Sequence, residues 1–360
     1  MLHASRALRP WRQLTTGVPT ALATPVTARA LAQAVAKLQG CESATLATST
    51  LHLFWDLFGI LAGDDIAIFM DAGAYPIAAW GVERAAAAGV PVQSFSHYQA
   101  EALEQRIRQS LSRHRIPVIV TDGLCPECGR VAPLADYWKS ARTRNGYLII
   151  DDTQASGILG HSPNREASYG HGGGGSLCWT GVRGDKILII SSLAKGFGVP
   201  IAVLSGSEAE IGRFENESET RVHCSPPAIA ALRSLEHALA ENEAQGDTLR
   251  EHLSKEVRYF RELLTNAGFA AKGGLFPVQT LAPMRHGEAR TVHARLLQNG
   301  VRPILHRGRS ANEARLSFII TALHRPADLE RAVAALAEAT DRKRMKFLTS
   351  IDSQRNLYNK

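Results

Sequence analysis

The sequence lacks the features that define several other classes of protein. No apolar run in its 360 residues approaches the roughly 18 residues that cross a bilayer, so we expect no membrane span. Cysteine is scarce and odd in number, at five residues, which does not fit the dense, even-numbered disulfide framework of small secreted domains. We therefore expect a soluble protein of the reducing cytoplasm, and we expect no bound metal.

Acidic residues are absent from the first 41 positions, where Arg6, Arg9, Arg12, Arg29 and Lys37 supply positive charge. Such a segment resembles a mitochondrial transit peptide, and a basic N-terminus with no targeting role is the alternative. Over the whole chain Lys and Arg number 41 against 34 acids, and the surplus is spread out rather than gathered in one block. This distribution does not indicate a nucleic-acid partner.

Strand-like and helix-like segments alternate through the first half of the chain. Short apolar runs predict buried strands, and the segments between them have apolar residues at helical spacing. This rhythm is typical of an α/β fold with a mainly parallel sheet flanked by helices. The predicted strands are 66–70, 90–95, 116–121, 147–151, 186–191 and 201–205, and the predicted helices are 27–39, 50–62, 76–89, 99–112 and 134–143.

The pattern changes after the last of these strands. Helical sequence continues to about residue 266 and is followed by a smaller set of strands and helices. We predict four parts: an N-terminal arm (1–26), a large domain (27–265), a small C-terminal α/β domain (266–341) and a basic tail (342–360).

Two residues are unusual among those at the carboxyl ends of the predicted strands, where open α/β sheets carry their chemistry. Asp151 closes the apolar run 147–150, and an acid there is costly unless it is paired, for example with a protonated ring nitrogen. Capping a turn is the alternative. Lys195 lies in a glycine-flanked loop after the apolar run 187–190, where desolvation can turn an amine into a nucleophile. A solvated surface charge is the alternative.

Two further positions can bind anions. Thr48, Ser49 and Thr50 place hydroxyls and backbone amides at the start of a helix, an arrangement that holds phosphate and that also serves as an ordinary N-cap. Arg315, on the predicted strand 315–320, can grip a substrate carboxylate or form a structural salt bridge.

We assign no function to two further motifs. Gly170–Gly175 satisfies the dinucleotide fingerprint, but we predict neither a strand before it nor a helix after it, so we interpret the glycines 172–175 as a flexible loop near the mouth of the active site. Cys125 and Cys128 have the spacing of a redox or zinc pair, yet no second such pair lies nearby.

Three ordered segments carry a family resemblance: Val120–Leu134, Asp151–Gly160 and Ser192–Gly198. Together they resemble the fold type I pyridoxal-phosphate enzymes of the aminotransferase class I/II superfamily, and within it the α-oxoamine synthases. The similarity extends from about Gly17 to Ala339. It implies a pyridoxal 5'-phosphate cofactor, a large cofactor-binding domain and a homodimer with active sites at the interface.

Position by position, the resemblance implies a role for each candidate site residue. Lys195 is expected to form the internal aldimine, and Asp151 to pair with the pyridinium nitrogen so that the protonated ring acts as an electron sink. Tyr75 is expected to stack on the ring, Gln154 to face its phenolic oxygen, and Arg315 to bind the substrate carboxylate. The remaining cofactor-binding positions are Ser49, Thr50, Leu51 and Ser192 at the phosphate, His223 at the phosphate of the neighbouring subunit, and Asp122 in the first segment.

The sequence departs from the α-oxoamine synthase pattern at four positions. These enzymes carry His where this chain has Tyr75 and Gln154, and Ser where it has Pro126 and Ala194. The changes are compatible with cofactor binding and leave the type of reaction open.

The expected activity is a pyridoxal-phosphate-dependent transfer reaction on an α-amino acid, through a Lys195 aldimine and a quinonoid carbanion. In the family-like outcome the carbanion attacks a second small-molecule substrate, an acyl thioester such as acyl-CoA. The alternative, which Tyr75 favours, is an aminotransferase or an enzyme of side-chain (β/γ) elimination or replacement. A non-catalytic scaffold that binds a ligand is the alternative from a different class.

Overall fold

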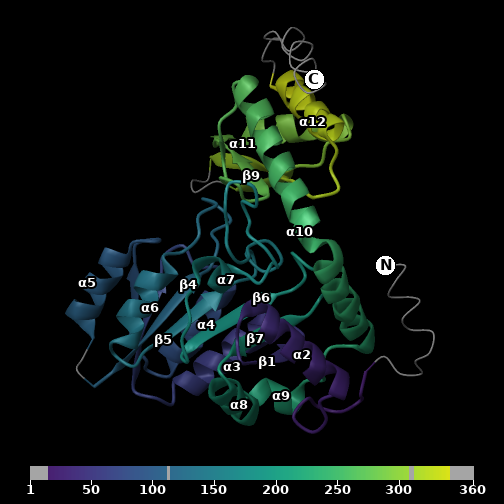
Figure 1. Ribbon diagram of the computed structural model, residues 1–360. Helices are drawn as coiled ribbons and strands as arrows, with labels where there is room; N and C mark the ends of the chain where they lie inside the picture. Colours follow the sequence, from purple (N-terminus) through teal and green to yellow (C-terminus); the bar gives the residue numbers. More distant parts are fainter. Residues whose placement is uncertain (1–14, 112–113, 308–311, 341–360) are drawn as a thin grey trace. The chain divides into compact units, whose positions relative to one another are not determined.

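The chain divides into two compact units in the computed structural model, which describes residues 15–111, 114–307 and 312–340 (Figure 1). Among the described residues, the first unit comprises the chain up to Cys125 together with Val131–Thr248, and the second comprises Pro126–Arg130 and the residues from Leu249 on. The first 14 residues of the predicted N-terminal arm and the predicted basic tail lie outside the described residues. No helix within the described ranges is long and apolar enough to cross a membrane.

A seven-stranded sheet forms the centre of the first unit. The antiparallel strand β7 lies between β1 and β6, whereas the other strands run parallel to one another. Their carboxyl ends therefore meet at one edge of the sheet. In spatial order the strands are β1 (Ser43–Ala47), β7 (Ala202–Gly206), β6 (Ile187–Ser192), β5 (Tyr147–Asp151), β4 (Ile116–Asp122), β2 (Ile66–Asp71) and β3 (Val92–Phe95).

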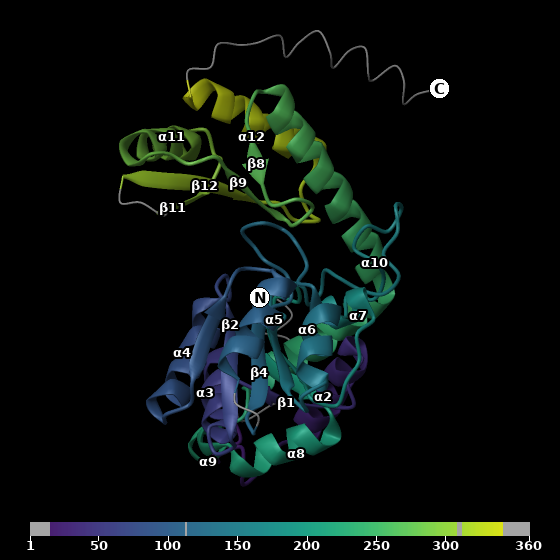
Figure 2. The ribbon, with the colours of Figure 1, turned by 90° about the vertical axis from the view of Figure 1, so that its left-hand side faces the viewer.

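Helices flank this sheet, as the alternation in the sequence predicts (Figure 2). Strand β1 is the strand of this sheet that the sequence prediction missed, because its five residues include two alanines and lack the strong apolar run of the other strands. The helices are α2 (Val26–Gln39), α3 (Thr50–Leu61), α4 (Pro76–Ala87), α5 (Ala100–Ser110), α6 (Leu134–Arg142), α7 (Ser176–Thr180), α8 (Glu208–Glu217), α9 (Glu219–His223) and α10 (Ile229–Asn266).

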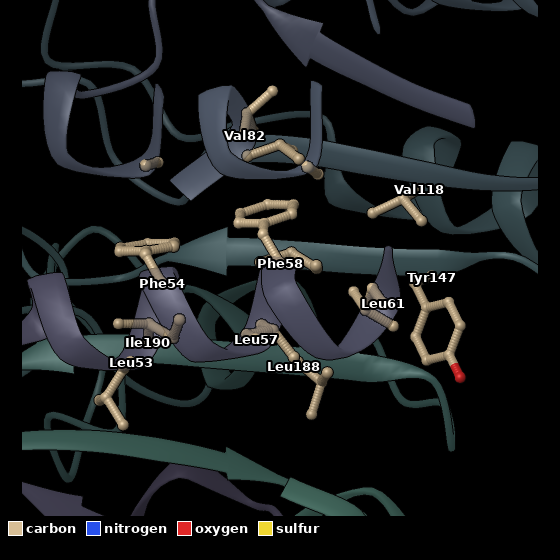
Figure 3. Close-up of a cluster of buried hydrophobic side chains, with 14 of the residues drawn as sticks. Leu53, Phe54, Leu57, Phe58, Leu61, Val82, Val118, Tyr147, Leu188 and Ile190 are labelled. Atoms are coloured by element: carbon tan, nitrogen blue, oxygen red, sulfur yellow. The ribbon is translucent and has the colours of Figure 1, made fainter. Parts of the chain in front are cut away.

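Helix α3 is anchored to the sheet by its apolar side. Phe54 and Phe58 are fully buried, one turn apart, with ring centroids separated by 6.4 Å. They pack in one cluster with Leu188 and Ile190 of β6 and with Val82 of α4 (Figure 3). A stripe of this kind fixes the helix on the sheet, so the start of α3, which follows β1, is held at the carboxyl edge.

The second unit contains an antiparallel sheet and its own core. Phe260 of α10 and Phe318 of β12 lie at its centre, with ring centroids 5.3 Å apart. Because the boundary between the two units falls within α10, the predicted domain boundary at residue 265 stays a prediction. The elements are β8 (Ala271–Lys272), β9 (Val278–Leu281), β10 (Met284–Arg285), α11 (His286–Gln298), β11 (Ile304–Arg307), β12 (Glu313–Ile319) and α12 (Pro326–Ala339).

Candidate active site

Two buried acids lie side by side at the carboxyl edge of the first unit's sheet. Asp122 ends β4, Asp151 ends β5, and the two residues are direct partners in the register of these parallel strands. They are only 4% and 6% exposed, respectively. Ser192 ends β6, the next strand in the sheet, so the edge gathers polar groups from three adjacent strands.

A cavity of about 210 Å³ opens at this edge. Its lining brings together most of the site residues predicted from the sequence and two that were not singled out, Thr153 and Ile77. The lining residues are Thr50, Tyr75, Ile77, Asp122, Asp151, Thr153, Gln154, Ser192 and Lys195.

Thr153 connects the acid on β5 to the end of β6. Its backbone N–H donates to Asp151 Oδ1 at 3.0 Å, and its hydroxyl accepts a hydrogen bond from the backbone N–H of Ser192 at 3.0 Å. The residue thus fixes the Asp151 carboxylate and holds the strand that leads to Lys195. A hydroxyl residue two positions after an aspartate at a strand end is the signal of this turn in the sequence.

Lys195 lies in the loop between β6 and β7, and its Nζ is 5.4 Å from the centroid of the Tyr75 ring. The loop packs closely on the turn after β5, because a Cβ at Gly196 would lie 2.2 Å from the carbonyl oxygen of Ser156. Lys195 is exposed when the whole residue is considered. Its ammonium group is nevertheless partly desolvated by the surrounding protein atoms, which lowers its pKa below the ordinary value. The carboxylates of Asp151 and Asp122 oppose this shift.

Tyr75 is positioned by the acid on β4. Its backbone N–H donates to Asp122 Oδ1 at 2.9 Å, and Pro76, the first residue of α4, favours the start of a helix there. The Tyr75 side chain stays 45% exposed, so its ring is available to stack on a planar ligand in the cavity.

Burial raises the pKa of both acids. For Asp151, hydrogen bonds from Thr153 and the charge of Lys195 oppose that shift. For Asp122, burial and then the negative charge of Asp151 raise the pKa to about 8, although the backbone hydrogen bond from Tyr75 lowers it. Two carboxylates that face one lysine are therefore expected to retain a proton between them near neutral pH.

Replacing Asp122 by asparagine is expected to change how stability depends on pH. The ordinary pKa of an aspartate, 3.8, applies to the unfolded chain, whereas the pKa of Asp122 is about 8 in the folded protein. In the window between these two pH values the folded protein holds a proton that the unfolded chain has released. Its stability must fall as pH rises through the window, by at most about 1.4 kcal/mol per pH unit. Asparagine cannot ionise, so the variant is expected to gain stability relative to the wild type as pH rises.

Denaturant unfolding of cofactor-free protein at a series of pH values tests this expectation, with Asp136→Asn on the exposed side of α6 as the control. Parallel curves for wild type and Asp122→Asn would contradict the raised pKa of Asp122.

The start of α3 has the arrangement predicted for an anion site. Ser49 is the N-cap, and its hydroxyl accepts the backbone N–H of Leu51 at 3.1 Å. No acidic residue lies in the first turn, so the positive end of the helix dipole is not neutralised there. Thr50 lines the cavity, whereas Ser49 and Leu51 are not among its lining residues.

The other two predicted site residues do not line the cavity. His223 is exposed at the end of α9, and its role at a neighbouring subunit stays a prediction. Arg315 belongs to the second unit, where its Nη1 forms an ion pair with Glu127 at 2.8 Å. The structural salt bridge, one of the two roles that the sequence allowed for Arg315, is therefore present. Binding of a substrate carboxylate by Arg315 stays a prediction.

The two unassigned motifs do not line the cavity. The glycine loop is followed by the short helix α7, contrary to the prediction, and is hydrogen-bonded to α10: the N–H of Gly172 donates to Asp247 and its carbonyl accepts from Asn242. The prediction of a flexible loop overlooked these bonds, which join residues about seventy positions apart. Cys125 and Cys128, both described by the structure, do not form a disulfide.

The donor set of the cavity fits pyridoxal phosphate. Among the described lining residues, two acids face a single lysine, and a protonated ring nitrogen would supply the missing positive charge for Asp151. The start of α3 and Ser192 offer donors to a phosphate, and Tyr75 offers an aromatic face. The lysine, with its lowered pKa, is suited to attack a carbonyl carbon.

Comparison with known proteins identifies related enzymes. Residues 12–336 match the model of the family described as aminotransferase class I and II. The 8-amino-7-oxononanoate synthase of Dechloromonas aromatica (strain RCB) is 28% identical over 286 residues, 77% of this chain and 69% of that protein. The synthase of Symbiobacterium thermophilum is 26% identical over 331 residues, 89% and 79% of the two chains. Some matches are partial: that of Marinobacter nauticus covers 60% of the relative.

Solved structures share the architecture at low sequence identity. Serine palmitoyltransferase from S. paucimobilis, with a bound PLP–myriocin aldimine, has a TM-score of 0.82 at 16% identity, covering 95% of this chain and 83% of that chain. The 8-amino-7-oxononanoate synthase from Francisella tularensis has a TM-score of 0.74 at 16% identity, covering 96% and 93%. These likenesses show the fold, which is fold type I.

Proposed function

The chain belongs to the aminotransferase class I and II family of pyridoxal-phosphate-dependent transferases, and from this premise we propose that it joins an α-amino acid to an acyl thioester, as an α-oxoamine synthase does. The observation that carries the proposal is the single cavity in which Lys195 faces Asp151, in a chain whose curated relatives are named 8-amino-7-oxononanoate synthases. Bound pyridoxal phosphate supplies an electron sink for a carbanion at the α-carbon of the amino acid.

Each of the main residues lining the cavity has its own proposed role. Lys195 Nζ would be the nucleophile that holds the cofactor, and the lysine amine would also move a proton at the α-carbon of the substrate. Asp151, fixed by Thr153, keeps a proton on the ring nitrogen. The start of α3 and Ser192 bind the phosphate, Tyr75 stacks on the ring and Gln154 faces the phenolic oxygen.

Residues outside the cavity complete the proposal. Arg315 binds the substrate carboxylate by exchanging its ion pair with Glu127 for one with the ligand. We propose a homodimer in which His223 of one subunit reaches the phosphate site of the other. None of the five cysteines, all of which the structure describes, forms a disulfide, which supports a reducing, cytoplasmic location. The predicted domains 27–265 and 266–341 would then serve cofactor and substrate binding.

A second reaction type is supported by two lining residues. The α-oxoamine synthase pattern has histidines where this cavity presents Tyr75 and Gln154, and an aromatic phenol at the stacking position suits aminotransfer or side-chain replacement. Both alternatives use the same lysine and the same acid, so they differ in what reacts with the α-carbon.

Release of free thiol distinguishes the reactions. Purified protein supplied with pyridoxal phosphate is incubated with a panel of amino acids and acyl-CoA, and thiol is measured over time with Lys195→Ala as the control. The proposal predicts thiol release that depends on both substrates and on Lys195. Conversion of the cofactor to pyridoxamine phosphate without thiol would overturn it in favour of aminotransfer, and release of a side-chain fragment would favour replacement.

A further inference from the structure

A charged residue lies inside the apolar core of the first unit. Asp56, on α3, is 1% exposed and follows the buried residues Leu53 and Phe54 in the helix that packs on the sheet. A carboxylate in such a place costs free energy unless other groups compensate for its lost hydration. The groups that contact Asp56 therefore indicate its structural role.

One carboxylate oxygen of Asp56 holds the start of α9. Oδ2 accepts hydrogen bonds from the hydroxyl of Ser218, from the backbone N–H of Thr220 at 3.1 Å and from the Thr220 hydroxyl at 2.6 Å. Ser218 is at the same time the N-cap of α9, accepting the backbone N–H of Arg221. The short helix is thus attached to α3 through three donors on one oxygen.

The other oxygen faces α4. Oδ1 lies 3.6 Å from Nη1 of Arg84, which also donates to the carbonyl of Trp55 at 2.8 Å. The Arg84 guanidinium lies 4.8 Å from the centroid of the Trp55 ring, and its Nη2 pairs with Glu219 of α9 at 2.7 Å. Asp56, Arg84, Ser218, Glu219 and Thr220, which we name the Asp56 clamp, join α3, α4 and α9.

Each of these helices carries a group assigned to the cofactor. Helix α3 begins at Thr50, α4 follows Tyr75, and α9 ends at His223. We infer that Asp56 is a positioning residue, whose clamp sets the start of α3 and the ring of Tyr75 at the spacing that pyridoxal phosphate requires. This inference rests on the proposed function, and Asp56 itself is not a lining residue of the cavity.

Asp56→Asn tests the inference through cofactor affinity. The amide retains the shape of the side chain but removes the charge and turns an N–H₂ group toward either the hydroxyls or Arg84. We expect the Kd for pyridoxal phosphate, titrated by absorbance well below the unfolding temperature, to rise about tenfold because the binding groups are displaced. Asp64→Asn is the matched control, since it breaks an ion pair with Arg213 at 2.8 Å in the same unit and should leave the Kd unchanged.

Gly59→Ala disturbs the clamp from its other side. A Cβ at Gly59 would lie 2.4 Å from the guanidinium carbon of Arg84, so the flexible end of that side chain must move away from Asp56. Alanine favours a helix over glycine, which opposes the stability lost when Arg84 moves away from the buried Asp56 carboxylate. We expect a severalfold rise in Kd at temperatures where the variant is fully folded.

The outcomes separate the inference from the proposed function. Wild-type protein that takes up no pyridoxal phosphate would overturn the proposed function and the inference with it. Normal binding by the wild type and unchanged Kd values in both clamp variants would overturn the inference alone. If Asp56→Asn does not fold, the Gly59→Ala result decides.

Discussion

Lys195→Ala is expected to abolish the Schiff-base absorption band of the bound cofactor and to lower kcat by about a thousandfold or more. The variant loses the amine proposed to hold pyridoxal phosphate and to move the proton at the α-carbon, and no other described lining residue of the cavity offers an amine. Asp151, Ser192 and the start of α3 remain, so the cofactor should still bind, but without covalent attachment.

Borohydride reduction followed by mass measurement checks the attachment directly. Reduced wild-type protein should carry the mass of the cofactor on the peptide that contains Lys195, and reduced Lys195→Ala should not. Lys186→Ala is the matched control, because the half-buried Lys186 lies just before β6, outside the cavity, and its ammonium donates to the carbonyl of Asn145. Retention of the covalent attachment and of activity in Lys195→Ala would refute the assignment of this lysine.

Asp151→Asn is expected to lower kcat by about a hundredfold to a thousandfold while leaving the covalent attachment at Lys195 intact. An amide has no charge with which to keep a proton on the ring nitrogen, so the electron sink weakens. The Thr153 N–H can still donate to the remaining oxygen, as it does to Asp151 Oδ1 at 3.0 Å, so the turn should persist. The predicted signature is a slow enzyme that is still yellow.

Steady-state rates and absorption spectra of Asp151→Asn and Asp151→Glu, measured side by side, check this role. The glutamate variant should recover part of the rate because it restores the charge, although its longer chain moves the carboxylate. If the asparagine variant turns over as fast as the wild type, Asp151 does not hold the proton of the ring nitrogen.

The sequence predicted the family and the cofactor because both depend on short ordered segments. The match over residues 12–336 confirms the predicted family, its pyridoxal-phosphate cofactor and the transferase class. Most helices and strands were also predicted within a few residues, since apolar periodicity records which side of each segment is buried. Strand β1 was missed for the same reason, because the short sequence Ser43–Ala47 has no strong apolar run or periodicity.

Two features of the first unit depend on strand pairing between residues that are distant in the sequence. Asp122 and Asp151 lie 29 positions apart in the chain, and only the parallel pairing of β4 with β5 makes them neighbours. Burial, and then the charge of the paired Asp151, raise the pKa of Asp122 to about 8. The antiparallel direction of β7 between β1 and β6 was likewise invisible in its apolar run, because an apolar run has no direction.

The sequence by itself determined that Asp151 ends a buried strand, that Lys195 follows one and that Thr50 starts a helix, because each of these properties depends on neighbours along the chain. Only the tertiary structure decided that Thr153 ties the two strand ends together and that Asp56 on α3 accepts a hydrogen bond from Ser218, 162 residues away. The physical reason is that hydrogen bonds, burial and charge act through space, so their partners are fixed by packing rather than by position in the sequence.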